Sequence, residues 1–137
     1  MIQKVILDTG PLVAFLKQDD RHHAWSVQRF REIACPLVTC EAVISEACFL
    51  LRHHPVGIEK IAAFLAHGDL VVEFSLAAHH RRVFALMQAY RGVPMSLADA
   101  CLVCMVEEGA SRKLFTLDSD FTVYRQHRHQ PIPLIIP

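Results

Sequence analysis

Short runs of β-branched and other apolar residues alternate with helical patterns along this chain. Four of these runs are predicted strands, at residues 3–7, 36–39, 70–74 and 114–117, and a possible edge strand at 132–136 is interrupted by Pro133. Helical patterns occupy the remaining stretches, at residues 12–16, 19–33, 41–53, 55–68, 77–90, 96–108 and 118–125. Such alternation predicts a mainly parallel sheet with helices on both faces. We therefore expect an α/β fold in three layers with about five strands.

The length of 137 residues fits a single domain that spans residues 1–137. No apolar run approaches the ~20 residues of a membrane-spanning helix, and the first residues lack a signal peptide, so we expect a cytoplasmic protein that does not enter a membrane. Five cysteines with mostly apolar neighbours indicate buried thiols rather than disulfides. Fourteen basic residues balance fourteen acidic ones. Any contact with nucleic acid must therefore come from a local basic patch.

Two aspartates directly follow predicted strands. Asp8 ends the first strand, and Asp118 ends the fourth in the segment Phe115-Thr116-Leu117-Asp118. Ligands of open parallel sheets bind at the carboxyl ends of the strands, so these carboxylates are expected to meet at one edge of the sheet. Each aspartate alone is better explained as the N-cap of the following helix than as a catalytic group.

Two further acids interrupt apolar helical patterns. Glu46 has Ala42, Val43, Phe49 and Leu50 as its neighbours three and four positions away, so it projects from an apolar face. An unpaired carboxylate on such a face would cost several kcal/mol or become protonated. Asp99 is also surrounded by apolar neighbours, but Ser96-Leu97-Ala98-Asp99 has the form of a capping box, which would account for it completely.

One hypothesis covers all four acids: Asp8, Glu46, Asp99 and Asp118 surround a common pocket and bind a divalent metal. Clustered carboxylates raise one another's pKa, whereas a hard cation cancels their repulsion. Ligands that are all oxygen favour Mg²⁺ or Mn²⁺ over zinc. The chemistry that fits this set is metal-assisted hydrolysis of a phosphodiester bond.

The order of four short segments resembles the PIN-domain nucleases, and most nearly the single-domain VapC-like toxins of type II toxin–antitoxin modules. The segments are Val5–Ala14, Leu37–Thr39 with Ser45-Glu46-Ala47, Pro94–Ala100 and Thr116–Phe121. The resemblance covers essentially the whole chain. It implies a parallel five-stranded sheet, Mg²⁺- or Mn²⁺-dependent endoribonuclease activity on RNA, and inhibition by a small cognate antitoxin. We also expect a homodimer.

The resemblance assigns roles to individual residues. The family's four acids match Asp8, Glu46, Asp99 and Asp118, with the three aspartates as metal ligands and Glu46 orienting or deprotonating the attacking water. Supporting roles go to a hydroxyl near the site, to an acid that assists through water and to a residue that caps the first helix: Thr116, Asp120 and Thr9. The best candidates for contacts with RNA phosphates are Arg125 and Arg128. At Ser96 the chain departs from close relatives, which often carry an aspartate there, and this weakens the expectation of a second metal.

Three other functions stay open. A stand-alone PIN-type RNA-processing nuclease would use the same residues. A catalytically silent module that binds RNA or protein would use the aspartates only as helix caps. Phosphoryl transfer with Asp8 as nucleophile is the least favoured, because the haloacid-dehalogenase pattern requires an aspartate where this chain has Gly10. Neither the nine histidines nor the pair Cys101 and Cys104 has the context of a metal or redox site.

Overall fold

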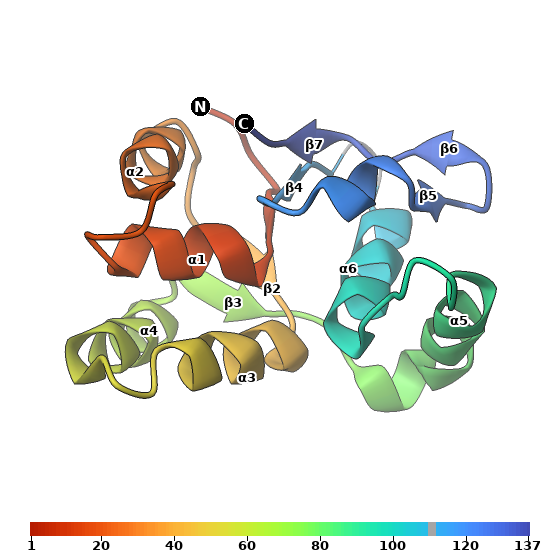
Figure 1. The fold of residues 1–137 in the computed structure, drawn as a ribbon, viewed down its shortest axis with the longest axis horizontal. Helices are drawn as coiled ribbons and strands as arrows, with labels where there is room; N and C mark the ends of the chain where they lie inside the picture. Colours follow the sequence, from red (N-terminus) through yellow and green to blue (C-terminus); the bar gives the residue numbers. More distant parts are fainter. Residues whose placement is uncertain (110–111) are drawn as a thin grey trace.

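The computed structural model describes residues 1–109 and 112–137, and its centre is a sheet of five strands (Figure 1). Every pairing in this sheet is parallel. The spatial order of the strands is β3 (Leu70–Val72), β2 (Leu37–Thr39), β1 (Ile6–Leu7), β4 (Leu114–Phe115) and β7 (Leu134–Ile135). The prediction of a mainly parallel sheet is confirmed, and the segment that follows Pro133 is indeed an edge strand.

Helices cover both faces of the sheet, which confirms the three layers. One face carries α1 (Thr9–Leu16), α2 (His23–Arg31), α3 (Glu41–Leu50) and α4 (Pro55–His67), and the other carries α5 (Leu76–Ala89) and α6 (Leu97–Glu108). Figure 1 shows these two groups of helices on either side of the sheet. Alternation along β1 explains the two cores: Val5 and Leu7 pack with the first group, and Ile6 packs with the second.

Several helix ends form where the sequence predicts them. Helix α4 begins at Pro55 and ends before Gly68, whose φ of 76° is left-handed and therefore suits glycine. The capping box before α6 is present, with reciprocal hydrogen bonds between Ser96 and Asp99. Within residues 1–109 and 112–137, no helix combines the length and apolar character needed to cross a membrane.

The predicted short helix at residues 118–125 is confirmed only in part. The segment instead forms a short 3₁₀ helix, η1 (Ser119–Thr122), followed by an antiparallel hairpin of β5 (Arg125–Gln126) and β6 (Gln130–Pro131). The turn of this hairpin places His127 and Arg128 at φ values of 49° and 70°. Left-handed turn positions are usually marked by Gly, Asn or Asp. The sequence has none of these in the turn, so it gives no local signal for a hairpin.

The predicted interior thiols are found on the α5–α6 side of the sheet. Cys40, Cys101 and Cys104 are buried in the core, and all five cysteines are free. Cys48 is half-buried, and Cys35 is exposed. The spacing of Cys101 and Cys104 therefore reflects the buried side of α6 rather than a redox site.

Candidate active site

The site begins where β1 and β4 end side by side. Leu7 of β1 lies opposite Phe115 of β4, so Asp8 and Thr116 come next on adjacent strands. The Thr116 hydroxyl donates a hydrogen bond of 2.7 Å to Oδ2 of Asp8, and the Thr9 N–H donates one of 2.7 Å to Oδ1. Asp8 is only 6% exposed. Pairing of these two strands thus holds one carboxylate at the carboxyl edge of the sheet.

The other predicted acids lie around the same cleft, which has a volume of about 430 Å³. Glu46 comes from α3, Asp99 from the first turn of α6, and Asp118 from the N-cap of η1. Asp120 also lines the cleft, and its N–H donates to Oδ1 of Asp118 at 2.9 Å. Folding therefore brings together five acids that are up to 112 positions apart along the chain, the interval from Asp8 to Asp120. We call this site the acidic cleft.

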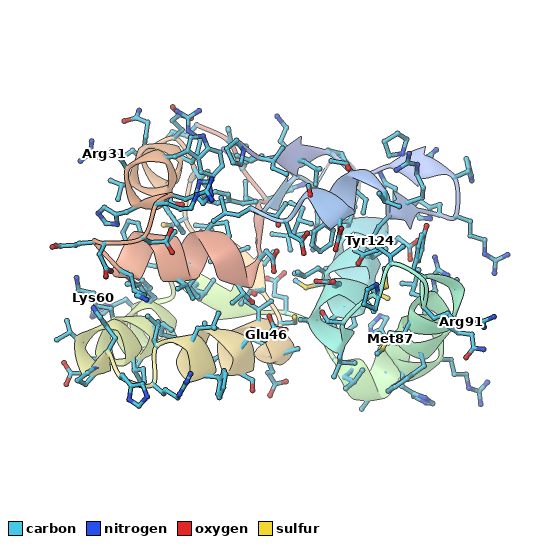
Figure 2. All side chains as sticks on the ribbon, viewed as in Figure 1. Arg31, Glu46, Lys60, Met87, Arg91 and Tyr124 are labelled. Atoms are coloured by element: carbon cyan, nitrogen blue, oxygen red, sulfur yellow. The ribbon has the colours of Figure 1, made fainter. Side chains whose placement is uncertain are left out.

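The environment of Glu46 differs from the prediction. We expected an apolar face that would make an unpaired carboxylate costly, but Phe49 and Leu50 on that face are 63% and 52% exposed. Glu46 itself is exposed, and its Oε2 accepts a hydrogen bond of 2.9 Å from the Thr9 hydroxyl. Figure 2 labels Glu46 on α3, beside the space between α1 and α6. The residue lies at the rim of the cleft, where water can solvate its charge.

The predicted role of Thr9 as a helix cap is also wrong. Asp8 is the N-cap of α1, and Thr9 is the first residue of the helix. Because Asp8 already accepts the free N–H at the helix start, the Thr9 hydroxyl is available to Glu46. Thr116 has two partners as well, since its Oγ1 donates to Asp8 and accepts from the Asp118 N–H at 2.9 Å. Two threonines therefore connect the acids of the cleft.

Asp99 has a partner that the sequence did not reveal. The hydroxyl of Tyr124 approaches Oδ2 of Asp99 at 3.3 Å, and the tyrosine is fully buried. Burial raises the pKa of Asp99, and the nearby charge of Asp118 raises it further. Burial and the charge of Asp99 raise the pKa of Tyr124, so the phenol stays protonated and can donate. Tyr124 lies between η1 and β5, so this contact joins the segment after η1 to the first turn of α6.

Asp8 has the most perturbed carboxyl group of the cleft. Burial raises its pKa from 3.8 to about 6, against the lowering effect of the Thr116 and Thr9 hydrogen bonds. The negative charges of Asp99 and Glu46 contribute in the same direction as burial. Burial and like charge thus both disfavour the ionised form of Asp8.

Among the described residues, the lining of the acidic cleft contains no lysine, arginine or histidine, and the acids accept hydrogen bonds from hydroxyl and N–H donors. In the part of the chain that is described, no three or more His, Cys, Asp or Glu side chains are close enough to coordinate one ion as they stand. The donor set nevertheless fits a hard divalent cation, because it is rich in carboxylate oxygens and lacks any other positive charge.

Arg125 and Arg128 do not line the acidic cleft. The Arg125 guanidinium donates through Nη1 to three successive backbone carbonyls, and Arg128 lies in the turn of the β5–β6 hairpin. Both residues border a second cavity beside α5. The two arginines that the sequence singled out therefore line the same cavity, and this cavity is separate from the acidic cleft.

The fold and the acids at its carboxyl edge define a class of protein. The family model of the PIN domain matches residues 5–126, so the chain belongs to the PIN domain family. Among solved structures it resembles VapC20 of Mycobacterium tuberculosis, described as a Sarcin-Ricin loop cleaving toxin, with a TM-score of 0.79 and 18% identity. That match covers 93% of this chain and 100% of the other. No match is found among curated proteins.

Proposed function

We propose that this protein is a metal-dependent endoribonuclease that acts as the toxin of a toxin–antitoxin pair. The observation that carries the proposal is the acidic cleft, where five carboxylates face one another with no basic side chain in the lining. Membership of the PIN domain family and the shared fold with a toxin that cleaves the Sarcin-Ricin loop support it. The substrate class is RNA, and the reaction is hydrolysis of a phosphodiester bond.

In this proposal Asp8, Asp99 and Asp118 hold Mg²⁺ or Mn²⁺. The bound cation would lower the pKa of the attacking water and neutralise negative charge on the phosphate. Asp8 is held in place by the Thr116 hydroxyl and the Thr9 N–H, so its two oxygens keep a fixed orientation at the edge of the sheet. The capping box and the Tyr124 hydroxyl orient Asp99 in the same way.

Glu46 is the proposed general base. It is exposed to water, and the hydrogen bond from the Thr9 hydroxyl directs Oε2 toward the cleft that Asp8 borders. General bases act from within hydrogen-bond reach of the proton they accept. Asp120 is proposed to assist through water, because it lines the cleft and orients the carboxylate of Asp118 through its N–H.

The proposed partners follow from the same class. A cognate antitoxin is expected to inhibit the enzyme, and the protein is expected to form a homodimer and to act on RNA in the cytoplasm. Leu50, which lines the acidic cleft, and its neighbour Phe49 are exposed apolar side chains, and they favour a surface that another protein covers. Light scattering of the purified chain would measure the dimer.

The test is cleavage of single-stranded RNA by the purified protein with and without Mn²⁺. Glu46→Gln is expected to lower the rate by roughly 10²–10⁴-fold, the range for loss of a general acid–base residue. Asp99→Asn is expected to lower the rate through loss of a metal ligand. Glu41→Gln is a matched control, because Glu41 is an exposed glutamate on the same helix but outside the cleft lining. Unaltered cleavage in both site variants would reject the acidic cleft as the active site.

Thermal unfolding separates an enzyme from a silent binding module. Mn²⁺ at about 100 times its Kd is expected to stabilise the parent by about 2.7 kcal/mol and the Asp99→Asn variant by much less. RNA binding without cleavage and without stabilisation by Mn²⁺ would favour the silent module. A short reading frame directly upstream of the gene would favour a toxin, and its absence would favour a stand-alone RNA-processing nuclease.

A further inference from the structure

A second cavity, of about 500 Å³, lies between α5 and the β5–β6 hairpin. Three arginines line it, Arg82 from α5 and Arg125 and Arg128 from the hairpin, and we call it the arginine pocket. Ala85 and Ala89 lie one turn apart on the α5 side of the pocket. Their short side chains leave open the space that the guanidinium groups border.

Two of the arginines are held by the protein and still have donors to spare. Nε and Nη2 of Arg82 donate to the two carboxylate oxygens of Glu107 at 3.0 and 2.8 Å. Nη1 of Arg125 donates to the carbonyls of residues 122–124 at 2.7–3.1 Å. Among residues 1–109 and 112–137, Nη1 of Arg82 and Nη2 of Arg125 have no hydrogen-bond partner. The pocket is thus lined by oriented guanidinium groups with unused N–H donors.

Arg128 is the third member and differs from the other two. Its guanidinium takes part in no hydrogen bond or ion pair with the described residues. The backbone at Arg128 is left-handed, with φ 70°, and a hydrogen bond from the His127 N–H to Glu107 anchors the turn beside Arg82. Left-handed backbone is costly for a bulky residue, and such residues cluster at functional sites. The fold therefore keeps a strained conformation that presents an unpaired arginine at the pocket.

The charge of the pocket selects the kind of ligand. Three arginines and Glu107 leave two net positive charges in a chain whose total charge is zero. Guanidinium groups match the oxygens of a phosphate with paired N–H donors, so a phosphate is the anion that fits best. The pocket is therefore the local basic patch that a neutral protein needs in order to bind nucleic acid.

The arginine pocket and the acidic cleft share a wall. The ring of Tyr90, which lines the arginine pocket, lies 5.1 Å from the ring of Tyr124, whose hydroxyl contacts Asp99 in the cleft. Helix α6 also connects them, with Asp99 in its first turn and Glu107 in its last. Eight residues of helix span about 12 Å. Roughly three to four stacked nucleotides cover that distance at about 3.4 Å each.

We propose that the arginine pocket binds a backbone phosphate of the RNA strand whose scissile bond lies in the acidic cleft. The proposal rests on the ribonuclease function proposed above. Arg128 supplies the free guanidinium, while Arg82 and Arg125 supply fixed donors on the two sides of the cavity. A phosphate held there fixes the position of the strand without reading its bases.

The experiment measures binding of a labelled single-stranded RNA by fluorescence anisotropy in the Glu46→Gln background, where cleavage is suppressed. Arg128→Gln is expected to raise Kd about tenfold and to reduce the slope of log Kd against log [NaCl] by about 0.7, the value for one phosphate contact on a single strand. In the otherwise wild-type chain the same change raises KM and leaves kcat unaltered, because the contact positions the strand.

Two further variants separate ligand binding from folding. Arg128→Gly removes the guanidinium but suits the left-handed backbone, so Kd rises as in Arg128→Gln while the unfolding temperature stays the same or increases. Arg31→Gln is the charge-matched control, because Arg31 is exposed on α2, far from the hairpin (Figure 2). The Kd of this variant for RNA is expected to equal that of the parent. Equal Kd values for the parent and both Arg128 variants would overturn the proposal.

The same measurements separate this proposal from the nuclease function and from a free-anion site. Cleavage by the parent together with unchanged Kd in the Arg128 variants would overturn the pocket and leave the nuclease. A raised Kd in these variants without cleavage by the parent would support the pocket and reject the nuclease. Calorimetry with inorganic phosphate tests whether the arginine pocket binds a free phosphate instead of a phosphate of RNA. Saturable phosphate binding that needs Arg128 but does not weaken RNA binding would overturn the proposal in favour of a free anion.

Discussion

The acidic cleft and the arginine pocket lie on either side of the Tyr90–Tyr124 pair and treat charge in opposite ways. In the arginine pocket Glu107 balances Arg82, and backbone carbonyls accept hydrogen bonds from Nη1 of Arg125. In the acidic cleft the donors to Asp8 and Asp99 from the described residues are all neutral. The carboxylates of the acidic cleft and the guanidinium groups of the arginine pocket therefore lie in separate cavities and, in the described part of the chain, do not pair with one another. The difference supports the proposal that a cation from solution neutralises the cleft.

The two regions are therefore expected to respond to pH with opposite sign. Burial raises the pKa of Asp8, so folding favours its protonated form, and stability is lost as the pH rises from 3.8 to about 6. For Glu107, burial opposes ionisation, but hydrogen bonds from Arg82 and from the His127 N–H lower its pKa below 4.5. Its contribution is present above pH 4.5 and is lost as the pH falls through the lowered pKa.

The largest effect is expected for Asp8→Asn in the presence of a chelator. A shift from 3.8 to about 6 corresponds to about 3 kcal/mol by linkage, so the variant should be more stable than the parent by up to that amount at pH 8. The gain should disappear near pH 4, where the parent aspartate is protonated. Urea unfolding at the two pH values measures both. Asp19→Asn, at an exposed turn, is the control. Equal stability of Asp8→Asn and the parent at pH 8 would contradict the conclusion that burial disfavours the charge of Asp8.

A smaller change of opposite sign is expected for Glu107→Gln. The variant loses the charge-assisted bonds to Arg82 and weakens the bond from the His127 N–H, which should lower the free energy of unfolding by about 2 kcal/mol at pH 7. The difference should shrink as the pH falls from 4.5 through the lowered pKa of Glu107, because the parent glutamate then loses its charge. Exposed Glu59→Gln serves as the control. A difference that does not depend on pH would show that the ion pair is not its cause.

Tyr124→Phe tests the wall between the two regions. The variant removes the hydroxyl that contacts Asp99 but keeps the buried ring and its packing on Tyr90. We expect a loss of about 1 kcal/mol in thermal or urea unfolding, as for one buried hydrogen bond. The RNA affinity should be retained, since the arginine pocket needs only the ring. An increase in Kd as large as that of Arg128→Gln would mean that the two regions are not separable.

The smallest effect is expected for Thr9→Val. This change removes the hydroxyl that orients Glu46 but keeps the shape of the side chain. Because Glu46 is exposed, water can replace the lost donor, so the cleavage barrier should rise by only about 0.5 kcal/mol, seen in kcat. Thr9→Ser should restore the parent rate. A loss as large as that of Glu46→Gln would show that Thr9 acts directly in the reaction.

The sequence by itself determined the layers and the acids of the cleft. Apolar β-branched runs and helical patterns, with Pro55 and Gly68 as helix boundaries, are local properties, and the order of strands and helices leaves few topologies open. Asp8 and Asp118 could be placed at one edge because parallel strands end together. For Glu46 the expected apolar face is exposed. The residue still lines the cleft, as the resemblance of Ser45-Glu46-Ala47 to the PIN-domain nucleases implied.

Only the tertiary structure decided the contacts between distant segments. Arg128 borders α5 because residues 125–131 form a hairpin, and Tyr124, just before this hairpin, reaches Asp99. No pattern in the sequence marks that turn, since its left-handed residues are stabilised by contacts such as His127 with Glu107, 20 positions away. Interactions of this range depend on the folded chain as a whole, and local propensities do not encode them.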